Sequence, residues 1–442
     1  MQVLYTSVNE LNEAIAISVS LTPTLTITNQ QLLSEKTIDL VIYNALFSTN
    51  DEVQSHSRSL IYQLSELSHI QASSTHDLYQ AFAFARLSGF TTPALNVRTL
   101  TFDIAQLVFR LMITKQIGAV IFEISRTEMV YTDQSPEQYA VSVLAAAIKA
   151  GYQGPVFLQG DHFQLNKDAF IKSRADEISG IKTLIASTIN AKFYNIDIDA
   201  STLVDLEKSD LADQQQINAQ MTAELSEYIR SIQPPSKIIS IGAEIGHIGD
   251  RNSSGADLKA FMGIYEGLIT GEGISKVSVQ TGSKHGGTLL ADGTLKAVTL
   301  DFSILREISA ISRNHYHFGG AVQHGASTLP DTAFDKFAEN DTLEVHLATG
   351  LQNIIYDNLP IALATKLSDW TRAQNASEES GDTNEQTIYR FRKKALGPFK
   401  KELWEMSVDE KEKIIAKLEE HLLIIFEKLN IFGTREKVLS LL

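Results

Sequence analysis

Cysteine is absent from the 442 residues of this chain. Its absence excludes disulfide bonds and thiolate ligands, so only His, Asp or Glu could hold a metal ion. Long hydrophobic runs are also missing, since no apolar stretch approaches the roughly 18 residues of a membrane span. The start, MQVLYTSVNELNEA, lacks a basic region followed by a hydrophobic block. We therefore expect no signal peptide and a cytoplasmic location.

Positive charge is scarce, because 38 Lys and Arg stand against 53 Asp and Glu and leave a formal net charge of −15. This balance disfavours nucleic acid and anionic membranes as partners. A small phosphorylated substrate is compatible with it. The charge of such a substrate could be met locally by a metal ion, by backbone N–H groups at helix starts or by a few Lys and Arg side chains.

Eight short runs rich in β-branched residues follow one another at spacings of roughly 25–45 residues, with helical patterns between most of them. This alternation predicts a parallel sheet, and eight units predict an eight-stranded (β/α) TIM barrel, with an open doubly wound sheet as the competing architecture. The predicted strands are PALNV (93–97), GAVIFEIS (118–125), PVFLQ (155–159), KFYNIDI (192–198), KIISIGAE (237–244), KVSVQTG (276–282), GGAVQHG (319–325) and TLEVHLAT (342–349).

The predicted barrel covers residues 75–359 and leaves an extension at each end. Residues 1–74 are expected to form a small α/β or helical unit without a chemical motif. Residues 360–442 are expected to be helical, and Ser407 with Glu410 has the pattern of a capping box. The helix that follows should cover the barrel, with an oligomer contact as the alternative. Its apolar stripe consists of Ile414, Leu418, Leu422, Ile425 and Leu429.

Three of the predicted strands end in a histidine close to glycine. PVFLQGDHF leads to Asp161 and His162, VSVQTGSKHGG to His285, and GGAVQHGAS to His324. The carboxyl ends of all strands in a parallel barrel meet at one face, where catalytic residues lie. Neutral imidazoles suit zinc, and three protein ligands with one open position are typical of catalytic zinc. We therefore predict one metal ion held by these three histidines, polarising a carbonyl or activating a water molecule.

Other polar residues at the strand ends complete the predicted site. Asp161 precedes a histidine ligand and should face another direction, which suits proton transfer better than metal binding; a supporting role beside a ligand is the alternative. The glycines near His285 and His324, together with Ser327, could hold a phosphate group through backbone amides. The remaining strand ends carry Asn96, Ser125, Asp199, Ser201, Glu244, His346 and Thr349.

Seven segments resemble, in order, the class II metal-dependent ketose-bisphosphate aldolases, which include fructose- and tagatose-bisphosphate aldolases. The likeness runs from about Thr75 to Leu359. It implies a zinc-dependent lyase of carbohydrate metabolism that splits a ketose bisphosphate into dihydroxyacetone phosphate and an aldehyde through a zinc-stabilised enediolate. The matching segments are ALNVRTL, GAVIFEIS, LQGDH, IDAS, GAEIGHIG, GSKHGG and HGAS.

The resemblance also implies roles for individual residues. The catalytic zinc would be held by His162, His285 and His324. Asp161 would move the proton of the hydroxyl that becomes the aldehyde, and Asp250 would protonate the enediolate carbon. A second or alternative metal position would lie near Glu244 and Asp199, and substrate and phosphate, with a possible monovalent cation, would be bound by Asn96, Ser125, Gly286, Gly325 and Ser327.

The chain departs from the family pattern at three places. His346 stands where the family usually has Asn, and GAST at 325–328 replaces Gly-Gly-Ser-Gly. The acidic loop after the fifth strand offers Asp250 and Asp257. His346 and Thr349, at the end of the last strand, join the candidate substrate-binding residues, although His346 could also be a metal ligand or fill space. These differences leave the identity of the substrate open.

Two other functions stay open. A barrel metallohydrolase would use zinc-bound water, but such barrels commonly place an HxH pair at the end of the first strand. The HxH of this chain, His315 and His317, precedes the seventh strand and should lie at the opposite rim. A non-catalytic aldolase-like or sugar-phosphate-binding subunit is favoured by His346 and the altered acidic loop, and disfavoured by the three predicted ligands with Asp161.

The basic cluster of Arg390, Arg392, Lys393 and Lys394 is predicted to be a solvated helix face. Contact with a second substrate phosphate is the alternative. We also expect the protein to form a homo-oligomer, either a dimer or a tetramer.

Overall fold

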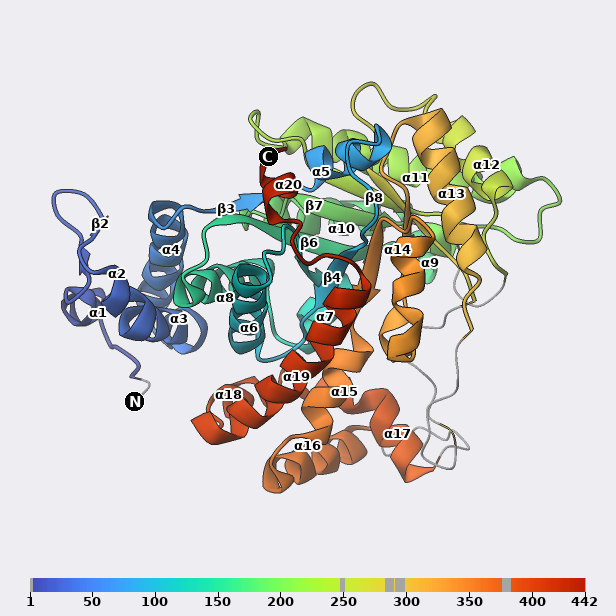
Figure 1. Cartoon of the computed structure of the whole chain (residues 1–442). Helices are drawn as coiled ribbons and strands as arrows, with labels where there is room; N and C mark the ends of the chain where they lie inside the picture. The colour runs from blue at the N-terminus through green and yellow to red at the C-terminus, as the bar shows by residue number, and fades with distance from the viewer. Residues whose placement is uncertain (1–2, 247–250, 283–289, 291–298, 376–382, 442) are drawn as a thin grey trace.

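Eight parallel strands close into a barrel at the centre of the molecule (Figure 1). The computed structural model describes residues 3–246, 251–282, 290, 299–375 and 383–441. The sheet closes because β4 pairs with both β5 and β11. All eight predicted strands are present, so the TIM-barrel prediction is confirmed and the open sheet is excluded. The strands are β4 (Thr92–Asn96), β5 (Ile121–Ser125), β6 (Gly154–Gln164), β7 (Asn195–Asp199), β8 (Ser240–Glu244), β9 (Lys276–Val279), β10 (Ala321–Gln323) and β11 (Glu344–Leu347).

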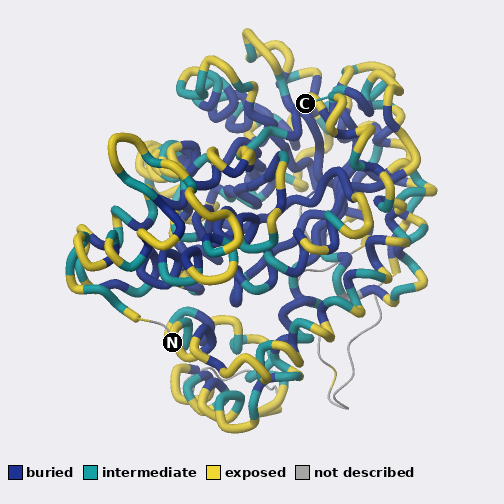
Figure 2. Tube along the Cα trace, turned by 60° about the vertical axis from the view of Figure 1, so that its left-hand side comes forward, coloured by how far each residue is buried: buried dark blue, intermediate teal, exposed yellow. Residues whose placement is uncertain are grey.

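Helices surround the barrel and leave its strands buried, as Figure 2 shows by burial. Capping residues mark the ends of these helices: Ser135 caps α8 in a capping box, and Gly151 ends the helix with a φ of 67°. The barrel helices are α5 (His76–Ala83), α6 (Thr101–Thr114), α7 (Arg126–Tyr131), α8 (Pro136–Ala150), α9 (Lys167–Lys172), α10 (Arg174–Asn190), α11 (Leu211–Ile232), α12 (Gly255–Tyr265), α13 (Phe302–Tyr316), α14 (Asp335–Glu339) and α15 (Thr349–Asp357).

The N-terminal residues form a helical unit beside the barrel and add a ninth strand to its sheet. β3 (Ile70–Ser73) pairs in parallel with the first half of β6, whereas the second half of β6 pairs with β7. The side chain of Asn195 donates to the carbonyl of Ser73 at 3.2 Å and accepts from the backbone N–H of Thr75 at 2.7 Å. β3 therefore lies between β6 and β7 at the amino end of the barrel, which the sequence analysis did not predict. The preceding elements are α1 (Val8–Ile15), β1 (Val19–Ser20), β2 (Thr26–Ile27), α2 (Gln30–Leu32), η1 (Leu33–Thr37), α3 (Ile38–Phe47) and α4 (Asp51–Leu67).

The C-terminal residues are helical, and the helices between residues 361 and 428 gather on one side of the barrel, whereas the last helix lies apart from them (Figure 1). Ser407 and Glu410 form the predicted capping box at the start of α19. All five residues of the predicted apolar stripe are buried, and α19 packs against α6 and α15. The prediction that this helix covers the barrel is therefore confirmed. The C-terminal elements are α16 (Ile361–Gln374), α17 (Asn384–Phe391), η5 (Arg392–Ala395), α18 (Lys400–Trp404), α19 (Val408–Lys428) and α20 (Arg435–Leu439).

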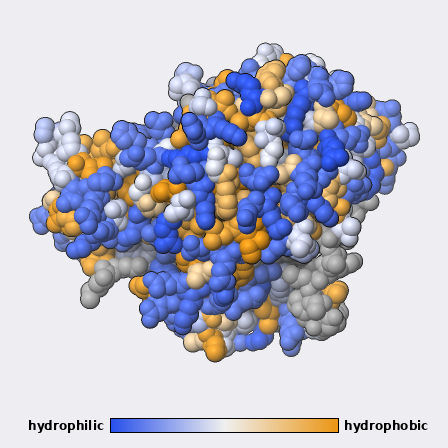
Figure 3. Space-filling view, in the orientation of Figure 1, coloured by the Kyte–Doolittle hydropathy of each residue, from blue (hydrophilic) through white to orange (hydrophobic). Residues whose placement is uncertain are grey.

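The outer surface is mostly hydrophilic on the face drawn in Figure 3, with small apolar areas between polar ones. No helix in the described part of the chain combines the length and the apolar character needed to cross a membrane.

Candidate active site

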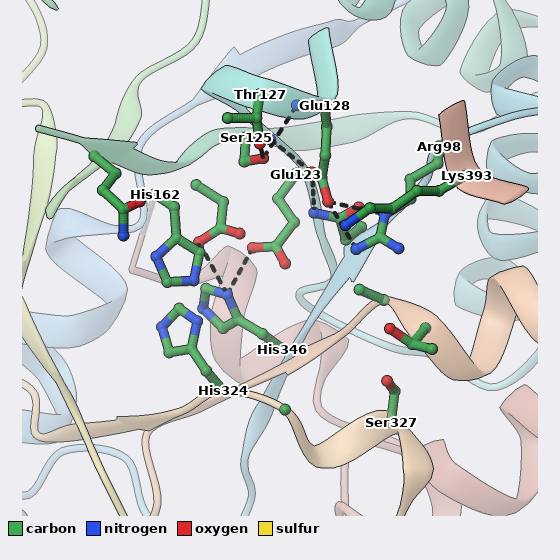
Figure 4. Close-up of a pocket in the computed structure, with 16 residues that line it drawn as sticks. Arg98, Glu123, Ser125, Thr127, Glu128, His162, His324, Ser327, His346 and Lys393 are labelled. Carbon is green, nitrogen blue, oxygen red and sulfur yellow. Dashed lines mark hydrogen bonds and ion pairs between the residues drawn. The ribbon is translucent and has the colours of Figure 1, made fainter. Parts of the chain in front are cut away.

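The carboxyl ends of the strands surround a cavity of about 270 Å³ (Figure 4). Three imidazoles, those of His162, His324 and His346, lie together on one side of it, and the cationic side chains of Arg98 and Lys393 lie on the other. The cavity is lined by Asn96, Arg98, Glu123, Ser125, Thr127, Glu128, Asp161, His162, Gln164, His324, Gly325, Ser327, His346, Ala348, Thr349 and Lys393.

A β-bulge at the end of β6 brings two neighbouring side chains into this cavity. The register with β7 shifts between Gly160 and Phe163, and His162 has a φ of 42°, in the left-handed region. The bulge turns the chain so that His162 Nε2 lies 3.8 Å from Asp161 Oδ1. The expectation that Asp161 and His162 face different directions is therefore wrong, because regular strand alternation ends at the bulge.

Buried donor atoms converge around His162. Its Nδ1 lies 3.2 Å from Asp199 Oδ2, at the end of β7, and 3.2 Å from Glu244 Oε2, at the end of β8. The ring of His324 is 4.3 Å from that of His162. Ligand atoms of His162, Glu244 and His324 lie within 4.8 Å of one another, as do those of Asp161, His324 and His346. Imidazole and carboxylate groups so close together could hold a divalent ion such as zinc.

Negative charge exceeds positive charge around the paired imidazoles. Burial, and then the neighbouring Asp199, raise the pKa of Glu244 to about 7. Burial alone would lower the pKa of His162, but Asp161 and Glu244 raise it well above its ordinary value. When no metal ion is bound, these carboxylates therefore favour the protonated form of the His162 imidazole. A divalent cation would supply the same counter-charge.

His346 links the rim of the cavity to the barrel interior. Its Nδ1 lies 3.4 Å from Asp161 Oδ1 and 3.0 Å from Glu123 Oε2. Its Nε2 is 2.6 Å from Glu344 Oε1, and its ring is 4.1 Å from that of His324. The imidazole therefore bridges carboxylates on both sides, which the shorter Asn side chain of the family pattern would not do.

A layer of buried polar side chains lies beneath the rim residues. Lys276 at the start of β9 is fully buried, and its ammonium lies 2.6 Å from Glu344 Oε1, 2.9 Å from Asp197 Oδ2 and 2.7 Å from Gln159 Oε1. Gln159 in turn donates to Glu123 Oε2 and to Glu344 Oε1, each at 2.9 Å. These charged and polar groups contact one another in a barrel interior that apolar side chains usually fill.

Sequence reasoning missed this layer, although a signal for it exists. Its polar residues stand two positions before rim residues on the same strands, so they face the same side as those residues. Gly242 stands two positions before Glu244 on β8. A Cβ there would lie 2.3 Å from Asp197 Oδ1, so the absence of a side chain makes room for that carboxylate. The pairs are Glu123 and Ser125, Gln159 and Asp161, Asp197 and Asp199, Lys276 and Ser278, and Glu344 and His346.

Arg98 on the opposite side of the cavity is held by its neighbours. Its Nη2 lies 2.7 Å from Glu128 Oε1, and its Nε donates to the same oxygen at 2.8 Å. Its Nη1 donates to Gln352 Oε1 at 2.9 Å. Glu128 also accepts from the Asn96 amide at 2.6 Å and closes the capping box with Ser125 at the start of α7. This network fixes the ends of β4 and β5 below the cavity mouth.

Small residues after β10 and β11 form the remaining wall. Gly325 has a φ of 70°, which a glycine adopts without strain, and leads into the short turn that carries Ser327. Thr349 is the first residue of α15. A Cβ at Gly350 would lie 2.2 Å from the carbonyl oxygen of Ser327, so the turn and the helix start are in close contact.

The described candidate residues mostly come together. Nine of them line the cavity, and Asp199 and Glu244 contact His162 beside it. Asp257 instead caps α12 and pairs with Arg251 at 2.5 Å, so it is occupied in the loop. The nine lining residues are Asn96, Ser125, Asp161, His162, His324, Gly325, Ser327, His346 and Thr349, whereas His285, Gly286 and Asp250 lie outside the described residues.

The HxH pair lies where the sequence analysis placed it. His315 is in the last turn of α13, and His317 lines a separate cavity with Gly273 and Phe318, before the starts of β9 and β10. This cavity is at the amino end of the barrel, away from the strand ends that carry His162 and His324. The pair therefore does not contribute to the candidate site.

Comparisons with known proteins agree with the resemblance. The family model "Fructose-bisphosphate aldolase class-II" matches residues 76–408, which extends past the last strand into the C-terminal helices. A comparison with curated proteins finds no match.

Several solved structures are similar to this chain at low sequence identity. The fructuronate-tagaturonate epimerase UxaE from Cohnella laeviribosi is 12% identical with a TM-score of 0.57, covering 88% of this chain and 90% of that chain. A fructose-bisphosphate aldolase from Campylobacter jejuni is 16% identical with a TM-score of 0.48, covering 83% and 98%. The YdjI aldolase from Escherichia coli K12 is 14% identical with a TM-score of 0.47, covering 83% and 100%.

Proposed function

Because the chain belongs to the class II fructose-bisphosphate aldolase family, we propose that it is a zinc-dependent aldolase that cleaves or forms a phosphorylated ketose. The observation that carries the proposal is the convergence of His162, His324 and Asp161 in one cavity at the carboxyl ends of the strands. Two histidines and an adjacent carboxylate in this position suit metal-assisted chemistry at a carbonyl group.

The residues present fit a zinc ion. His162, His324 and Glu244 offer nitrogen and oxygen donors within 4.8 Å of one another, and Asp199 adds a carboxylate beside His162. The raised pKa of Glu244, caused by burial and by Asp199, indicates uncompensated negative charge that a cation would neutralise. When bound, zinc supplies Lewis acidity at the ketose carbonyl and hydroxyl oxygens.

Asp161 is the residue that we assign to proton transfer. Its side chain lies in the cavity next to His162 and within 3.4 Å of His346 Nδ1. The Asp161 carboxylate would accept the proton of the ketose hydroxyl that becomes the aldehyde oxygen. The bonding pair of the broken carbon–carbon bond then passes to the carbon next to the ketose carbonyl, and that carbon takes up a proton to complete cleavage.

Ser327, Gly325 and Thr349 are the residues that we assign to binding a phosphate group of the substrate. They lie on the wall formed after β10 and β11, and the close contact of Gly350 with Ser327 keeps the turn against the start of α15. Hydroxyl groups and backbone N–H groups of such turns suit phosphate oxygens.

Schiff-base chemistry at Lys276 is the metal-independent route to the same cleavage, and the surroundings of this lysine disfavour it. Burial alone would lower the pKa of Lys276, but Asp197 and Glu344 raise it above its ordinary value. A nucleophilic lysine must be neutral, so the ammonium of Lys276 is better suited to a structural role.

Turnover of fructose 1,6-bisphosphate and tagatose 1,6-bisphosphate, with products resolved by NMR, tests the proposal. We expect aldehyde and dihydroxyacetone phosphate to form, chelator to stop the reaction, and added Zn²⁺ to restore it. Activity that survives complete metal removal, or formation of an epimer without cleavage, would contradict the proposal.

A further inference from the structure

We propose that Lys393, on the C-terminal extension, binds a substrate anionic group, a phosphate or carboxylate, at the end of the cavity remote from the imidazoles. This inference rests on the proposed function, because it assigns the second charged end of the same substrate. Lys393 belongs to the basic cluster that the sequence analysis expected to be a solvated helix face. The structure instead includes it in the cavity wall.

Two anchors hold the segment that carries Lys393. On one side, Arg392 Nη2 donates to Asn353 Oδ1 at 2.7 Å, and the hydroxyl of Tyr356 donates to the Arg392 carbonyl at 2.5 Å. Both partners lie on α15, the helix that begins at the cavity. Lys393 lies between the anchored Arg392 and the buried Ala395, so its backbone position is defined.

The second anchor joins the same segment to α7, on the other side of the cavity. The backbone N–H of Gly397 donates to the Tyr131 carbonyl at 3.1 Å. A Cβ at Gly397 would lie 2.6 Å from that oxygen, so the glycine allows the close approach. The ammonium of Lys393 lies 5.7 Å from the ring centroid of the same tyrosine. η5 thus spans from α15 to α7, and Lys393 is held between the two helices.

Lys393, rather than Arg98, is the basic side chain that could pair with an anionic ligand. Arg98 and Lys393 are the two basic side chains of the Lys and Arg type that line the cavity, and Arg98 is paired with Glu128 and donates to Gln352. No salt bridge with a carboxylate is found for Lys393 among the described residues. Burial and the nearby Arg98 lower the pKa of Lys393, whereas Glu128, which is itself paired with Arg98, raises it. An anionic ligand would add a counter-charge for Lys393.

The two sides of the cavity consequently carry different groups. The imidazoles of His162, His324 and His346 mark one side, and Lys393 stands with Arg98 on the other (Figure 4). A substrate that reacts beside the imidazoles would direct its far end toward Lys393. An acyclic sugar phosphate with a charge at that end fits this arrangement by charge complementarity.

The test compares Lys393→Met with Lys394→Met, which removes the same charge one residue away and outside the cavity lining. Calorimetry with inorganic phosphate, and separately with acetate, gives a readout independent of turnover. We expect Lys393→Met to weaken binding of one of these anions about tenfold and Lys394→Met to leave it unchanged. The preferred anion identifies the group as phosphate or carboxylate.

Kinetics give the second readout. The two substrates to compare are fructose 1,6-bisphosphate and fructose 1-phosphate. We expect Lys393→Met to raise the KM for the bisphosphate about tenfold and to change the KM for the monophosphate by less than about twofold. Equal effects of both substitutions, or equal anion binding by Lys393→Met and the unchanged protein, would overturn the inference. Lys393-dependent anion binding without cleavage of any ketose would support it while contradicting the aldolase proposal.

Discussion

The Lys276 ammonium and the Glu344 carboxylate lie 2.6 Å apart inside the barrel, with 0% of either side chain exposed. Glu344 also accepts from His346 at the rim, so a buried ion pair supports a residue of the candidate active site. Two buried charges are costly to desolvate, and removal of one partner leaves the other uncompensated. The pair is therefore expected to affect both stability and the position of His346.

Glu344→Gln should destabilise the protein by about 3 kcal/mol near neutral pH, because Lys276 would keep only Asp197 as an ionic partner. Burial alone would raise the pKa of Glu344, but Lys276 and His346 lower it to about 2, below its ordinary 4.5. The stabilising contribution is complete above pH 4.5 and is lost as the pH falls through about 2. Denaturation midpoints should therefore differ most at neutral pH and converge in acid. Exposed Glu339→Gln is the control, and a pH-independent difference would contradict this expectation.

Asp161→Asn should lower kcat by about 10²–10⁴-fold, because an amide cannot accept the hydroxyl proton. Zinc content, measured by mass spectrometry, should stay unchanged since Asp161 is assigned to proton transfer. Asp168→Asn, at an exposed position shortly after β6, is the matched control. Loss of zinc in Asp161→Asn would reassign this residue to the metal.

His346→Asn, which introduces the residue usual in the family, should lower kcat about tenfold. Asn cannot bridge Glu344 and Asp161 as the two imidazole nitrogens do. Metal content should be unaffected. A fall in metal content would make His346 a ligand, and unchanged kinetics would show that it only fills space.

Chelator should lower the thermal midpoint of the protein, and Zn²⁺ should restore it, because a ligand that binds the folded state stabilises it. In His162→Ala this response should be lost, since the ligand set around Glu244 and His324 is then incomplete. His315→Ala, an exposed position at the opposite end of the barrel, should respond like the unchanged protein. A full zinc response in His162→Ala would contradict the proposed metal site.

Gly350→Ala should displace the wall that we assign to phosphate binding, because the added methyl group would lie 2.2 Å from the Ser327 carbonyl oxygen. We expect a loss of about 1–3 kcal/mol in stability and a higher KM for phosphorylated substrates. Gly263→Ala in α12, where no atom lies within 4 Å of the new methyl group, should be neutral or slightly stabilising. Equal behaviour of both variants would contradict the role of the close contact.

Much of the rim could be predicted from the sequence. Runs such as PVFLQ and TLEVHLAT identify strands by local composition, and parallel topology brings their carboxyl ends together regardless of packing details. This is why Asp161, His162, His324 and His346 could be assigned to one site before any coordinates.

Tertiary structure alone decided the direction of these side chains and their partners. The bulge at His162 arises from the pairing of β6 with β7, and the contacts of Lys276 with Glu344 and Asp197 join three different strands. Lys393 reaches the cavity because α15 and α7 anchor a distant helical segment. Local patterns determine which residues form an element and where it ends, whereas contacts between residues far apart in the chain depend on packing, which no short stretch of sequence encodes by itself.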